Sequence, residues 1–559
     1  MTWHPWHRSS IAPDGTHHRV DGREMYAARF HCVQKYHEPG LAPVVDESGA
    51  YHITADGIAA YAARFLQAWG FYGGRAAVQD QRGWFHILAD GQELTRDRFD
   101  WCGNFQEGRC TVRSRSGQYF HITHVGSPAY TERYLYAGDF RDGSAVVRCA
   151  ERGLCTHINP DGHHTHGQWH LDLDVFHKGY ARARDRSGWF HVDATGRPIT
   201  LRRYAEVEPF YNGQARVLTH DGEYQVVDER GHVCASVGRD SYDRFHQVSA
   251  ALVGHWRTDA IAAAVSLGVF EHLPARGAEL AGAIAAPADS LSRLLGALWE
   301  LRLVDRREGG LWEATLSGQL LDRRSAPNLA DAATEYGGPL RDCWSSLRKA
   351  IMSARWRPPD VFASAASDPA RVAAIQRMMA AYAQHDYSDI AHVLPFKEAR
   401  TIVDVAGGTG VLARMLADRF PAVDVVVLER PEVCEFAGTG SIHPRVRFVS
   451  GDVYEPWPVR ADGFVMSRVL HDWNDDDARR ILRQARAATS PGSSGVILEM
   501  LLDDATPFGR VCDLHLMVVT GGRERTLDQI GSLLREAGFR LVRVEPTASL
   551  VSAVLVEAV

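Results

Sequence analysis

Several features that would place this 559-residue sequence in a special class are absent. The nine cysteines form no Cys-x-x-Cys pair, which argues against a disulfide framework and favours reduced thiols in the cytoplasm. No run of about 18 apolar residues occurs, so no membrane-spanning helix is expected. The first residues, MTWHPWHRSSIAPDG, lack the apolar core of a signal peptide, and we expect none.

The overall charge argues against one broad function. The formal charge is −7, so the chain as a whole is not expected to bind nucleic acid. Hydrophobic residues make up 45% and charged residues 23%, a mixture typical of globular proteins that bury several cores. At about 150 residues per domain, this length predicts roughly three or four domains.

What the sequence does contain is a repeat across its first 240 residues. One phrase, seen as YHITADG at 51–57 and WFHILADG at 84–91, returns at intervals of 34 to 36 residues. Its aligned residues are His52, His86, His121, His157, His191 and Gln225, and His18 fits an earlier copy. A second phrase, such as FYGGRAAV at 71–78, keeps the same step. A fixed period over this length indicates a repeat architecture.

The composition of each repeat favours β-structure over the helical repeats that share this period. Short aromatic and β-branched runs alternate with polar residues and end at Gly or Asp-Gly turns. We expect about six or seven β units in a propeller-like or solenoid array. The phrases F-x-x-G-x-A-x-V and W/Y-F-H-I-x-x-x-G resemble the WG-repeat family over residues 15–235, although an intact Trp-Gly occurs only at Trp69-Gly70.

The repeated histidine raises the question of metal binding. A residue that recurs once per repeat usually fills the same scaffold position, because stacking sets the repeat positions, and we expect that role here. The denser cluster His163, His164, His166 and His170 lacks paired cysteines or carboxylates, so a solvated loop is favoured over a zinc site there. Repeat surfaces often bind partners, which makes this module a candidate for holding a bulky substrate or a protein.

Residues 248–321 change to an Ala-rich texture in which apolar positions have helical spacing. The order helix, turn, helix and short hairpin around Gly309-Gly310 is typical of a winged helix. Its second helix, Asp289 to Leu301, carries a single basic residue, Arg293, whereas a helix that contacts bases in DNA needs several polar or basic side chains. Burial of this apolar helix against a partner is favoured, and a dimer interface is expected.

The segment TIVDVAGGTGVLARMLADRFPAVDVVVLE, residues 401–429, predicts a buried strand, a glycine turn, a helix and a second strand. Gly407, Gly408 and Gly410 let a ligand approach the backbone closely at the start of the helix. Glu429 ends the second strand, where an acid suits two ribose hydroxyls. Such a unit binds either a nicotinamide dinucleotide or S-adenosylmethionine (SAM), and it does not distinguish them by itself.

Further motifs follow in order. VRFVSGDVYEPWP (446–458) places an acid after a third strand, and ADGFVMSRVLHDWNDDDARRIL (461–482) runs a fourth strand into His-Asp-Trp. GVILEMLL (495–502) and the GGRERT of residues 521–526 each add a glutamate. With the glycine turn, these motifs resemble the class I SAM-dependent O-methyltransferases of the plant and bacterial natural-product type, over about residues 245–559. In that family the winged-helix region dimerises and helps to form the partner's active site, so the resemblance implies a homodimer.

The resemblance implies a set of residues that bind SAM as cofactor. They are Ser388, Asp404, Gly407, Gly408, Gly410, Glu429, Asp452 and Val453. Asp404 and the glycines would surround the methionine part, Glu429 would bind the ribose, and Asp452 with Val453 would bind the adenine. Ala406 stands where many members have a glycine, and its small methyl group is expected to cause little loss.

The resemblance also implies a catalytic set. His471 would remove the proton of a hydroxyl acceptor, since histidine titrates near neutral pH. Glu499 or Glu524 would bind its other ring nitrogen and so fix the tautomer. Asp513 and Met517 would line the substrate pocket, where the adaptable thioether of Met517 suits a flat aromatic ring.

Each catalytic residue has a plainer alternative when it is taken singly. His471 could cap the helix that begins near Asp475, Glu524 could form a surface pair with Arg523, and Glu499 could face water at a strand end. Together, in the order that the family has them, the three residues favour catalysis.

The sequence thus predicts a multidomain protein with an all-β repeat array at 1–238, a winged-helix dimerisation domain at 239–340 and an α/β Rossmann-like methyltransferase domain at 341–559. The predicted activity is SAM-dependent methylation of a natural-product hydroxyl by a cytoplasmic homodimer, without metal, membrane or nucleic-acid partner. A second hypothesis is a methyltransferase for a ribosomal or carrier-bound peptide that the repeats recruit. A third is a SAM-sensing DNA-binding regulator, which the sparse basic residues disfavour.

Overall fold

The computed structural model describes residues 5–239, 244–353, 355–387, 390, 393–438, 440, 443–503 and 507–559. The chain folds as two compact units, Met1–Arg239 and Asp240–Val559, which we call unit 1 and unit 2. The boundary predicted at 340/341 lies inside unit 2, which holds a helical lobe and an α/β lobe. No helix in the described ranges is long and apolar enough to cross a lipid bilayer.

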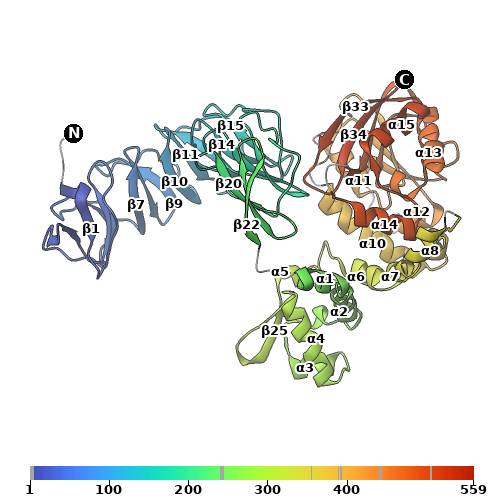
Figure 1. Ribbon diagram of the computed structural model, residues 1–559, viewed down its shortest axis with the longest axis horizontal. Helices are drawn as coiled ribbons and strands as arrows, with labels where there is room; N and C mark the ends of the chain where they lie inside the picture. Colours follow the sequence, from blue (N-terminus) through green and yellow to red (C-terminus); the bar gives the residue numbers. More distant parts are fainter. Residues whose placement is uncertain are drawn as a thin grey trace. The chain divides into compact units, whose positions relative to one another are not determined.

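Unit 1 is a succession of small antiparallel sheets whose strands pair in chain order (Figure 1). The first three sheets are β1–β2–β3 (Ser9–Ile11, His18–Val20, Arg23–Glu24), β4–β5–β6 (Cys32–Val33, Ala42–Asp46, Gly49–Ile53) and β7–β8–β9 (Gln67–Tyr72, Arg75–Asp80, Gly83–Ile87). A six-stranded sheet follows, β10–β15 (Trp101–Gln106, Arg109–Arg113, Tyr119–Thr123, Tyr134–Ala137, Ala145–Cys149, Cys155–Ile158). The last are β16–β17–β18 (Asp172–Leu173, Ala181–Asp185, Gly188–Val192) and β19–β22 (Glu206–Val207, Gln214–Leu218, Glu223–Asp228, Val233–Arg239). The expected β-repeat character is confirmed, while the WG-repeat resemblance and the closure of the array stay predictions.

The repeated histidine links each repeat to the next. Nε2 of His52, the residue before the end of β6, donates to the carbonyl of Trp69 on β7 at 2.8 Å, and its Nδ1 accepts from the Tyr61 hydroxyl. The other copies make the same bond to a carbonyl 17 residues on: His86 to Gly103, His121 to Gly138, His157 to Asp174 and His191 to Glu208. All five are buried. The scaffold role predicted for this histidine is therefore confirmed.

The glycine turns explain why the period is kept so strictly. Gly57 and Gly91 have φ of +75° and +83°, which glycine adopts without strain. A Cβ on Gly57 would lie 2.5 Å from the Tyr26 ring, and one on Gly91 would lie 2.6 Å from the Tyr61 ring. Each turn therefore packs against a tyrosine one repeat earlier, and a side chain there would separate the two repeats.

The histidine-rich loop differs from the solvated loop that the sequence predicts. His166 contacts Nδ1 of His157 at 2.9 Å, and Nε2 of the buried His170 donates to the carbonyl of Gly196 at 3.1 Å. His163 and His164 are exposed. The prediction is wrong for His166 and His170 because they supply the ring contacts and inter-sheet bonds that a tyrosine or the repeat histidine supplies elsewhere.

The helical lobe of unit 2 confirms the helix, turn, helix and hairpin order. Its elements are α1 (Arg244–Leu252), α2 (His255–Ser266), η2 (Phe270–His272), β23 (Ala275–Arg276), α3 (Gly277–Ala283), α4 (Ala288–Glu300), β24 (Val304–Arg306), η3 (Glu308–Gly310), β25 (Leu311–Ala314) and α5 (Leu316–Gln319). Strands β23, β25 and β24 form one small sheet. Leu291, Leu295 and Leu298 of α4 pack in the core of this lobe, so its apolar face is not the free partner surface that the sequence suggested.

A different apolar face is exposed on α1 and α2. Phe245, Val248, Leu252 and Trp256 are 61–74% exposed. The first three recur at intervals of three and four residues, so they lie along one side of α1. This stripe is exposed, whereas Leu291, Leu295 and Leu298 of α4 are buried.

The α/β lobe carries a seven-stranded sheet in the order β28–β27–β26–β29–β30–β34–β33. Its strands are β26 (Thr401–Val405), β27 (Asp424–Glu429), β28 (Val446–Ser450), β29 (Ala461–Ser467), β30 (Thr489–Glu499), β33 (Phe539–Pro546) and β34 (Ser552–Ala558). The first five are parallel, and β34 runs antiparallel to both of its neighbours. The order reverses between β26 and β29, and ligands of open parallel sheets bind outside the carboxyl ends of the strands at such a point.

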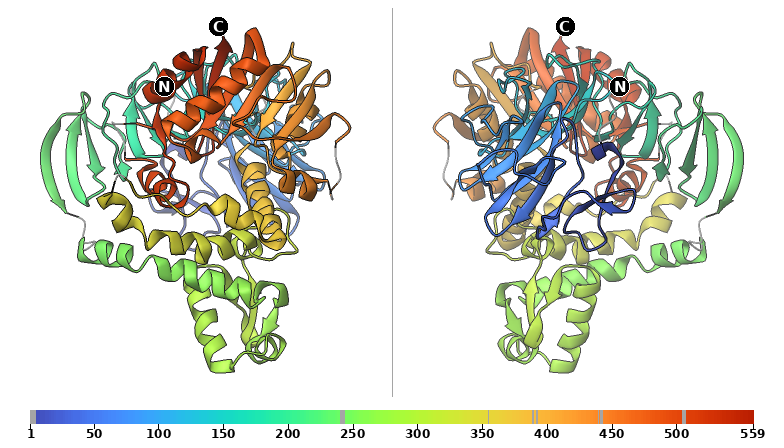
Figure 2. Two further views of the ribbon diagram at one scale, coloured as in Figure 1. Left: turned by 90° about the vertical axis from the view of Figure 1, so that its right-hand side faces the viewer. Right: turned by 90° about the vertical axis from the view of Figure 1, so that its left-hand side faces the viewer.

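Helices cover both faces of this sheet. On one face, α13 (Asp475–Ala488) and α15 (Leu527–Ala537) bury their apolar sides, and on the other face α11 (Val411–Arg419) does so. The remaining elements are α12 (Pro431–Ala437), η5 (Leu470–Asp472), α14 (Arg510–Val519) and the short pair β31 (Leu501–Leu502) and β32 (Arg525–Thr526). The two lobes are joined through α6 (Ala330–Gly337), α7 (Pro339–Trp344), α8 (Leu347–Met352), α9 (Val361–Ala366) and α10 (Pro369–Asp386), drawn in yellow shades in Figure 2.

Candidate active site

A cavity of about 1780 Å³ opens at the carboxyl ends of the central strands of unit 2. Its wall is formed by the glycine turn after β26, the ends of β27 and β28, the loop after β29, and side chains of α10 and α14. A typical small-molecule pocket has roughly 300–1,000 Å³, so this cavity has room for two ligands side by side.

The glycine turn crosses directly over a buried acid. A Cβ on Gly407 would lie 2.4 Å from Oδ2 of Asp404, so only glycine lets the chain pass there. Gly408, with φ of +57°, donates its N–H to Oε2 of Glu429 at 3.1 Å. Gly410, with φ of +73°, is the N-cap of α11. The turn therefore brings the backbone close to Asp404 and Glu429 at the start of a helix, as expected of a ligand-binding loop.

Two buried carboxyl groups face this turn. Burial, and then the neighbouring Glu429, raise the pKa of Asp404 to about 7, and its Oδ2 has no hydrogen-bond partner among the described residues. Burial also raises the pKa of Glu429. Such groups call for a ligand that brings hydrogen-bond donors or a positive charge, such as an amine and ribose hydroxyls.

Asp452 and Val453 also line this half of the cavity, directly after β28. The Asp452 side chain is exposed and accepts from the N–H of Tyr454 at 2.9 Å. Ser388 lies outside the described residues. Of the other cofactor positions implied by the sequence, Gly410 caps α11 outside the lining, and the rest line the cavity.

Ala406 has a strained backbone. Its φ is +52°, in the left-handed region that disfavours residues with a Cβ. The expectation from the sequence considered only the small size of the Ala406 methyl group. The structure shows that the replacement of glycine affects the backbone conformation instead.

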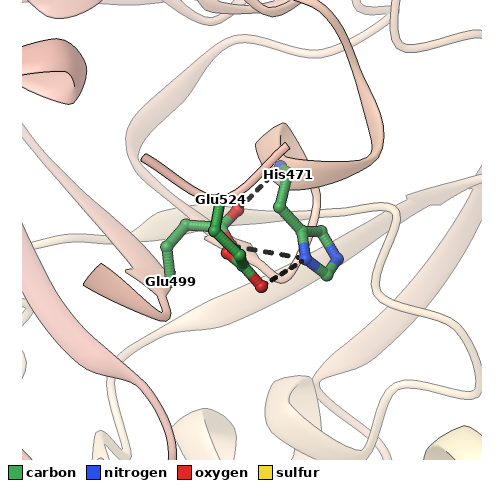
Figure 3. Close-up of side chains that lie close together, drawn as sticks. All are labelled: His471, Glu499 and Glu524. Carbon is green, nitrogen blue, oxygen red and sulfur yellow. Dashed lines mark hydrogen bonds and ion pairs between the residues drawn. The ribbon is translucent and has the colours of Figure 1, made fainter. Parts of the chain in front are cut away.

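His471 and two glutamates, Glu499 and Glu524, come together in unit 2 (Figure 3). Nδ1 of His471 lies 3.3 Å from Oε1 of Glu524 and 4.0 Å from Oε2 of Glu499. The N–H groups of Leu470 and His471 donate to Oε1 of Glu499 at 2.9 and 3.3 Å. Because the glutamate can only accept, Nδ1 carries a proton and Nε2 is the basic nitrogen of the neutral ring.

The plainer alternatives for these residues are wrong. Asn474, whose side chain accepts from the N–H groups of Asp476 and Asp477, caps α13, so His471 is not needed as a cap. Glu499 and Glu524 are buried, which excludes a strand end in water and a surface pair.

Arg468 is a member of this cluster that the sequence did not predict. Its Nη1 lies 2.9 Å from Oε1 of Glu524 and 4.0 Å from Oε2 of Glu499. Its φ of +56° turns the chain out of β29 and aims the side chain at the glutamates. His471, Glu499 and Glu524 form the one cluster in the described ranges with metal-ligand spacing, and the Arg468 guanidinium already neutralises its carboxylates.

These charges set the protonation of His471. Burial alone would lower its pKa, but the carboxylates of Asp472 and Glu499 raise the pKa above the ordinary 6.5, and Arg468 opposes them. Burial raises the pKa of Glu499, whereas His471 and Arg468 outweigh burial and lower the pKa of Glu524. Glu524 is therefore the carboxylate that faces the ring as an anion.

The GGRERT segment packs against the His471 loop and forms hydrogen bonds to its backbone. A Cβ on Gly522 would lie 2.0 Å from the carbonyl of His471, so glycine is required for this approach. Arg523 donates its N–H to the same carbonyl at 2.8 Å. The buried Arg525 donates to the carbonyls of Leu470 and Trp473 at 2.8 and 2.7 Å. The motif thus positions the base and supplies Glu524.

Only one of the two residues predicted to contact substrate lines the cavity. Met517 of α14 lines the cavity. Asp513 instead accepts from the N–H of Glu524 at 2.8 Å and so orders the catalytic loop. Gln376 of α10, which the sequence did not single out, faces the glycine turn, and its Oε1 has no hydrogen-bond partner in the described part of the chain.

Comparison with protein families matches residues 344–540 to an O-methyltransferase domain. The mitomycin biosynthesis 6-O-methyltransferase of Streptomyces lavendulae is 31% identical over 315 residues, covering 54% of this chain and 90% of the relative. The 2,7-dihydroxy-5-methyl-1-naphthoate 7-O-methyltransferase of Streptomyces carzinostaticus is 32% identical over 310 residues, covering 51% of this chain and 90% of the relative.

Solved structures share the fold of about half of the chain. The mitomycin 7-O-methyltransferase MmcR superposes with a TM-score of 0.52 at 29% identity, covering 56% of this chain and 98% of MmcR. LaPhzM superposes with a TM-score of 0.54 at 25% identity, covering 57% of this chain and all of LaPhzM.

Proposed function

The chain belongs to the O-methyltransferase family and is a SAM-dependent methyltransferase, and from this membership we propose that it methylates a hydroxyl group of a natural product. Relatives named for mitomycin and dihydroxynaphthoate support this acceptor class. The observation that carries the proposal is a single cavity whose lining includes both the glycine turn and His471.

The glycine-turn half of the cavity suits SAM. Asp404, whose Oδ2 lacks a partner, would accept a hydrogen bond from the ammonium group, and Glu429 would accept from ribose hydroxyls. Asp452 and Val453, which line the cavity, would bind the adenine. Gly407, Gly408 and Gly410 would admit the methionine part. When bound, the sulfonium of SAM supplies the methyl group.

His471 then acts as the general base. Its Nε2 accepts the hydroxyl proton as the acceptor oxygen attacks, and the resulting imidazolium is stabilised by Glu524 at Nδ1. Glu499 fixes the loop through the N–H groups of Leu470 and His471, so the ring is aimed before substrate binds. Holding acceptor and methyl donor in line contributes the orientation on which this displacement depends.

The proposal is tested with labelled SAM and a panel of hydroxyaromatic compounds. Transfer of label to oxygen, with the product position found by mass spectrometry and NMR, supports O-methylation. Label on nitrogen or on a carboxylate would contradict it. A rate that is unchanged in His471→Ala would remove the general base, because only an acceptor that is already ionised needs none.

We also propose that the stripe Phe245, Val248, Leu252 and Trp256 forms a homodimer interface. An apolar stripe of this exposure is typical of an interaction surface. The double variant Val248→Asp/Leu252→Asp is expected to sediment as a monomer where the unaltered chain sediments as a dimer. A monomer in both cases would contradict the interface.

One observation favours a second candidate, in which unit 1 recruits a peptide or a carrier-bound acceptor. Trp69, Trp101 and Tyr136 occupy the first strands of successive repeats and are 43–50% exposed. The rings of Trp101, Tyr119 and Tyr136 follow one another at centroid distances of 6.5 and 5.9 Å. The variant Trp69→Ala/Trp101→Ala/Tyr136→Ala is expected to lose labelling of such an acceptor while it still labels free phenols, and equal loss of both would contradict this role.

A further inference from the structure

A histidine that lines the cavity has its protonation fixed by a tryptophan that does not line it. His515 lies on α14 and lines the cavity, whereas Trp344 ends α7 and lies outside the lining. Nε1 of Trp344 donates to Nδ1 of His515 at 3.1 Å. The rings are 6.1 Å apart, and the ring of Tyr336 lies 5.9 Å from that of His515.

This contact selects one tautomer. An indole nitrogen only donates, so Nδ1 of His515 has to be the unprotonated, accepting nitrogen. The proton of the neutral ring is therefore on Nε2. A doubly protonated ring would place two N–H groups against each other, and burial with the nearby charges of His471 and Arg468 lowers the pKa of His515 in the same direction.

The protonated Nε2 is available to a ligand. No described residue accepts a hydrogen bond from it, and the ring belongs to the same cavity wall as His471 and Met517. His471 has the opposite arrangement, since its Nδ1 donates to Glu524 and its Nε2, 3.7 Å from Oδ1 of Asp472, is the unprotonated nitrogen. The cavity therefore presents one histidine that takes a proton and one that offers a hydrogen bond.

We propose that His515 is a specificity-determining donor that binds a carbonyl oxygen on the aromatic acceptor, so that the preferred substrates are hydroxyaryl ketones and related hydroxyaryl carbonyl compounds. The other titratable and charged groups around it include His471, Arg468, Cys512 and Tyr336. This inference rests on the proposed function, because it assumes that the acceptor occupies this half of the cavity. Trp344 is a positioning residue, since it acts through His515.

The test uses the full chain loaded with S-adenosylhomocysteine and a set of acetyl-2-naphthol isomers, each beside the ethyl-2-naphthol of the same substitution. The two members of a pair have nearly the same shape and the same hydroxyl, and they differ in the carbonyl oxygen. At least one acetyl isomer is expected to bind about five- to tenfold more tightly than its ethyl partner in calorimetry, the value of one neutral hydrogen bond.

Variants separate hydrogen bonding from shape. His515→Leu is expected to abolish the preference within the pair, and His515→Gln to restore most of it, because the glutamine Nε2 group donates from a similar place. Trp344→Phe is expected to reduce the preference and to replace the single Nε2–H tautomer in the ¹⁵N spectrum by a mixture. A structural role of His515 would change both members of the pair equally.

The outcomes are distinguishable from failure of the proposed function. Absence of a preference in the unaltered chain, a preference that persists in His515→Leu, or an Nδ1–H tautomer in the spectrum would each overturn the role of His515. Loss of S-adenosylhomocysteine binding by the unaltered chain, or no methyl transfer to any naphthol, would instead contradict the proposed function.

Discussion

Buried histidines in unit 1 and in unit 2 have opposite chemistry. In unit 1, burial lowers the pKa of His52, His86, His121 and His157 to about 4. In unit 2, His471 is just as buried, yet the carboxylates around it raise its pKa above 6.5. The histidines of unit 1 contact neutral groups, namely backbone carbonyls, tyrosine hydroxyls and a second histidine. His471 contacts carboxylates.

The difference shows that burial alone does not make a catalytic histidine. A neutral ring between a carbonyl and a hydroxyl makes both of its hydrogen bonds in one tautomer, and nothing beside it stabilises the protonated form. A ring beside an ionised carboxylate is stabilised once it has accepted one. Sequence spacing alone separates these cases in this chain, because the repeat histidines recur and His471 does not.

The largest expected effect is acid unfolding of unit 1. Five histidines, the four above and His170, have folded pKa values of about 4 against 6.5 in the ordinary ring. The unfolded chain therefore binds protons more strongly, so stability present above pH 6.5 is lost as the pH falls towards 4. The loss is roughly 3 kcal/mol per histidine at the low end.

Calorimetry of the full chain between pH 7.5 and 4.5 measures this loss as a falling transition temperature of unit 1. His121→Gln is the matched control, because Gln225 occupies the aligned position in a later repeat. This variant is expected to weaken the pH dependence of the transition temperature, since unfolding would take up one proton fewer. A transition that is independent of pH would refute the neutral scaffold histidines.

The next effect is on catalysis. His471→Ala is expected to lower kcat for naphthol methylation by about 10³-fold, within the range of general-base catalysis, because the hydroxyl keeps its proton. Binding of S-adenosylhomocysteine, measured by calorimetry, should persist. The control is His121→Ala, which removes an equally buried histidine from unit 1 and should leave kcat unchanged; a similar fall in kcat for both variants would remove the contrast.

Glu524→Gln is expected to have a smaller effect, roughly 30-fold on kcat. Loss of the carboxylate at Nδ1 lowers the pKa of His471, so the acid limb of the kcat/KM profile should move to lower pH as the plateau falls. An acid limb that moves to higher pH would show that Glu524 does not stabilise the imidazolium.

The smallest effect is expected from Arg468→Gln. Removing the cation leaves the carboxylates to act on His471 unopposed, so its pKa rises and the acid limb moves to higher pH. The rate at pH 6.5 should fall roughly threefold, with little change at pH 8.5. Arg468→Lys keeps the charge and should restore the profile in part, whereas identical profiles for all three proteins would exclude this role.

Much of the α/β lobe could be predicted from the sequence because its signals are local. The runs at 401–405 and 423–429 are apolar enough to specify buried strands, and the glycines between them specify the turn. His471, Glu499 and Glu524 lie together as expected: His471 follows β29, Glu499 ends β30, and Glu524 directly precedes β32.

Other features depend on contacts that no local pattern contains. Arg468 joins the catalytic cluster only because its left-handed backbone redirects the side chain. Trp344 and His515 are 171 residues apart in the sequence, and their contact follows from α7 packing against α14. The apolar residues of α4 and of α1 look alike in the sequence, yet one set fills a core and the other is exposed.

The most direct test is a ¹⁵N NMR titration of all histidine side chains in the full chain, with His471 assigned from the spectrum of His471→Ala. We expect two classes of buried histidine in one sample, which differ in pKa. His52, His86, His121 and His157 should remain neutral until the pH approaches 4. His471 should titrate above 6.5 with its neutral proton on Nδ1. If His471 stayed neutral together with the repeat histidines, or carried its proton on Nε2, the assignment of His471 as the base would be contradicted.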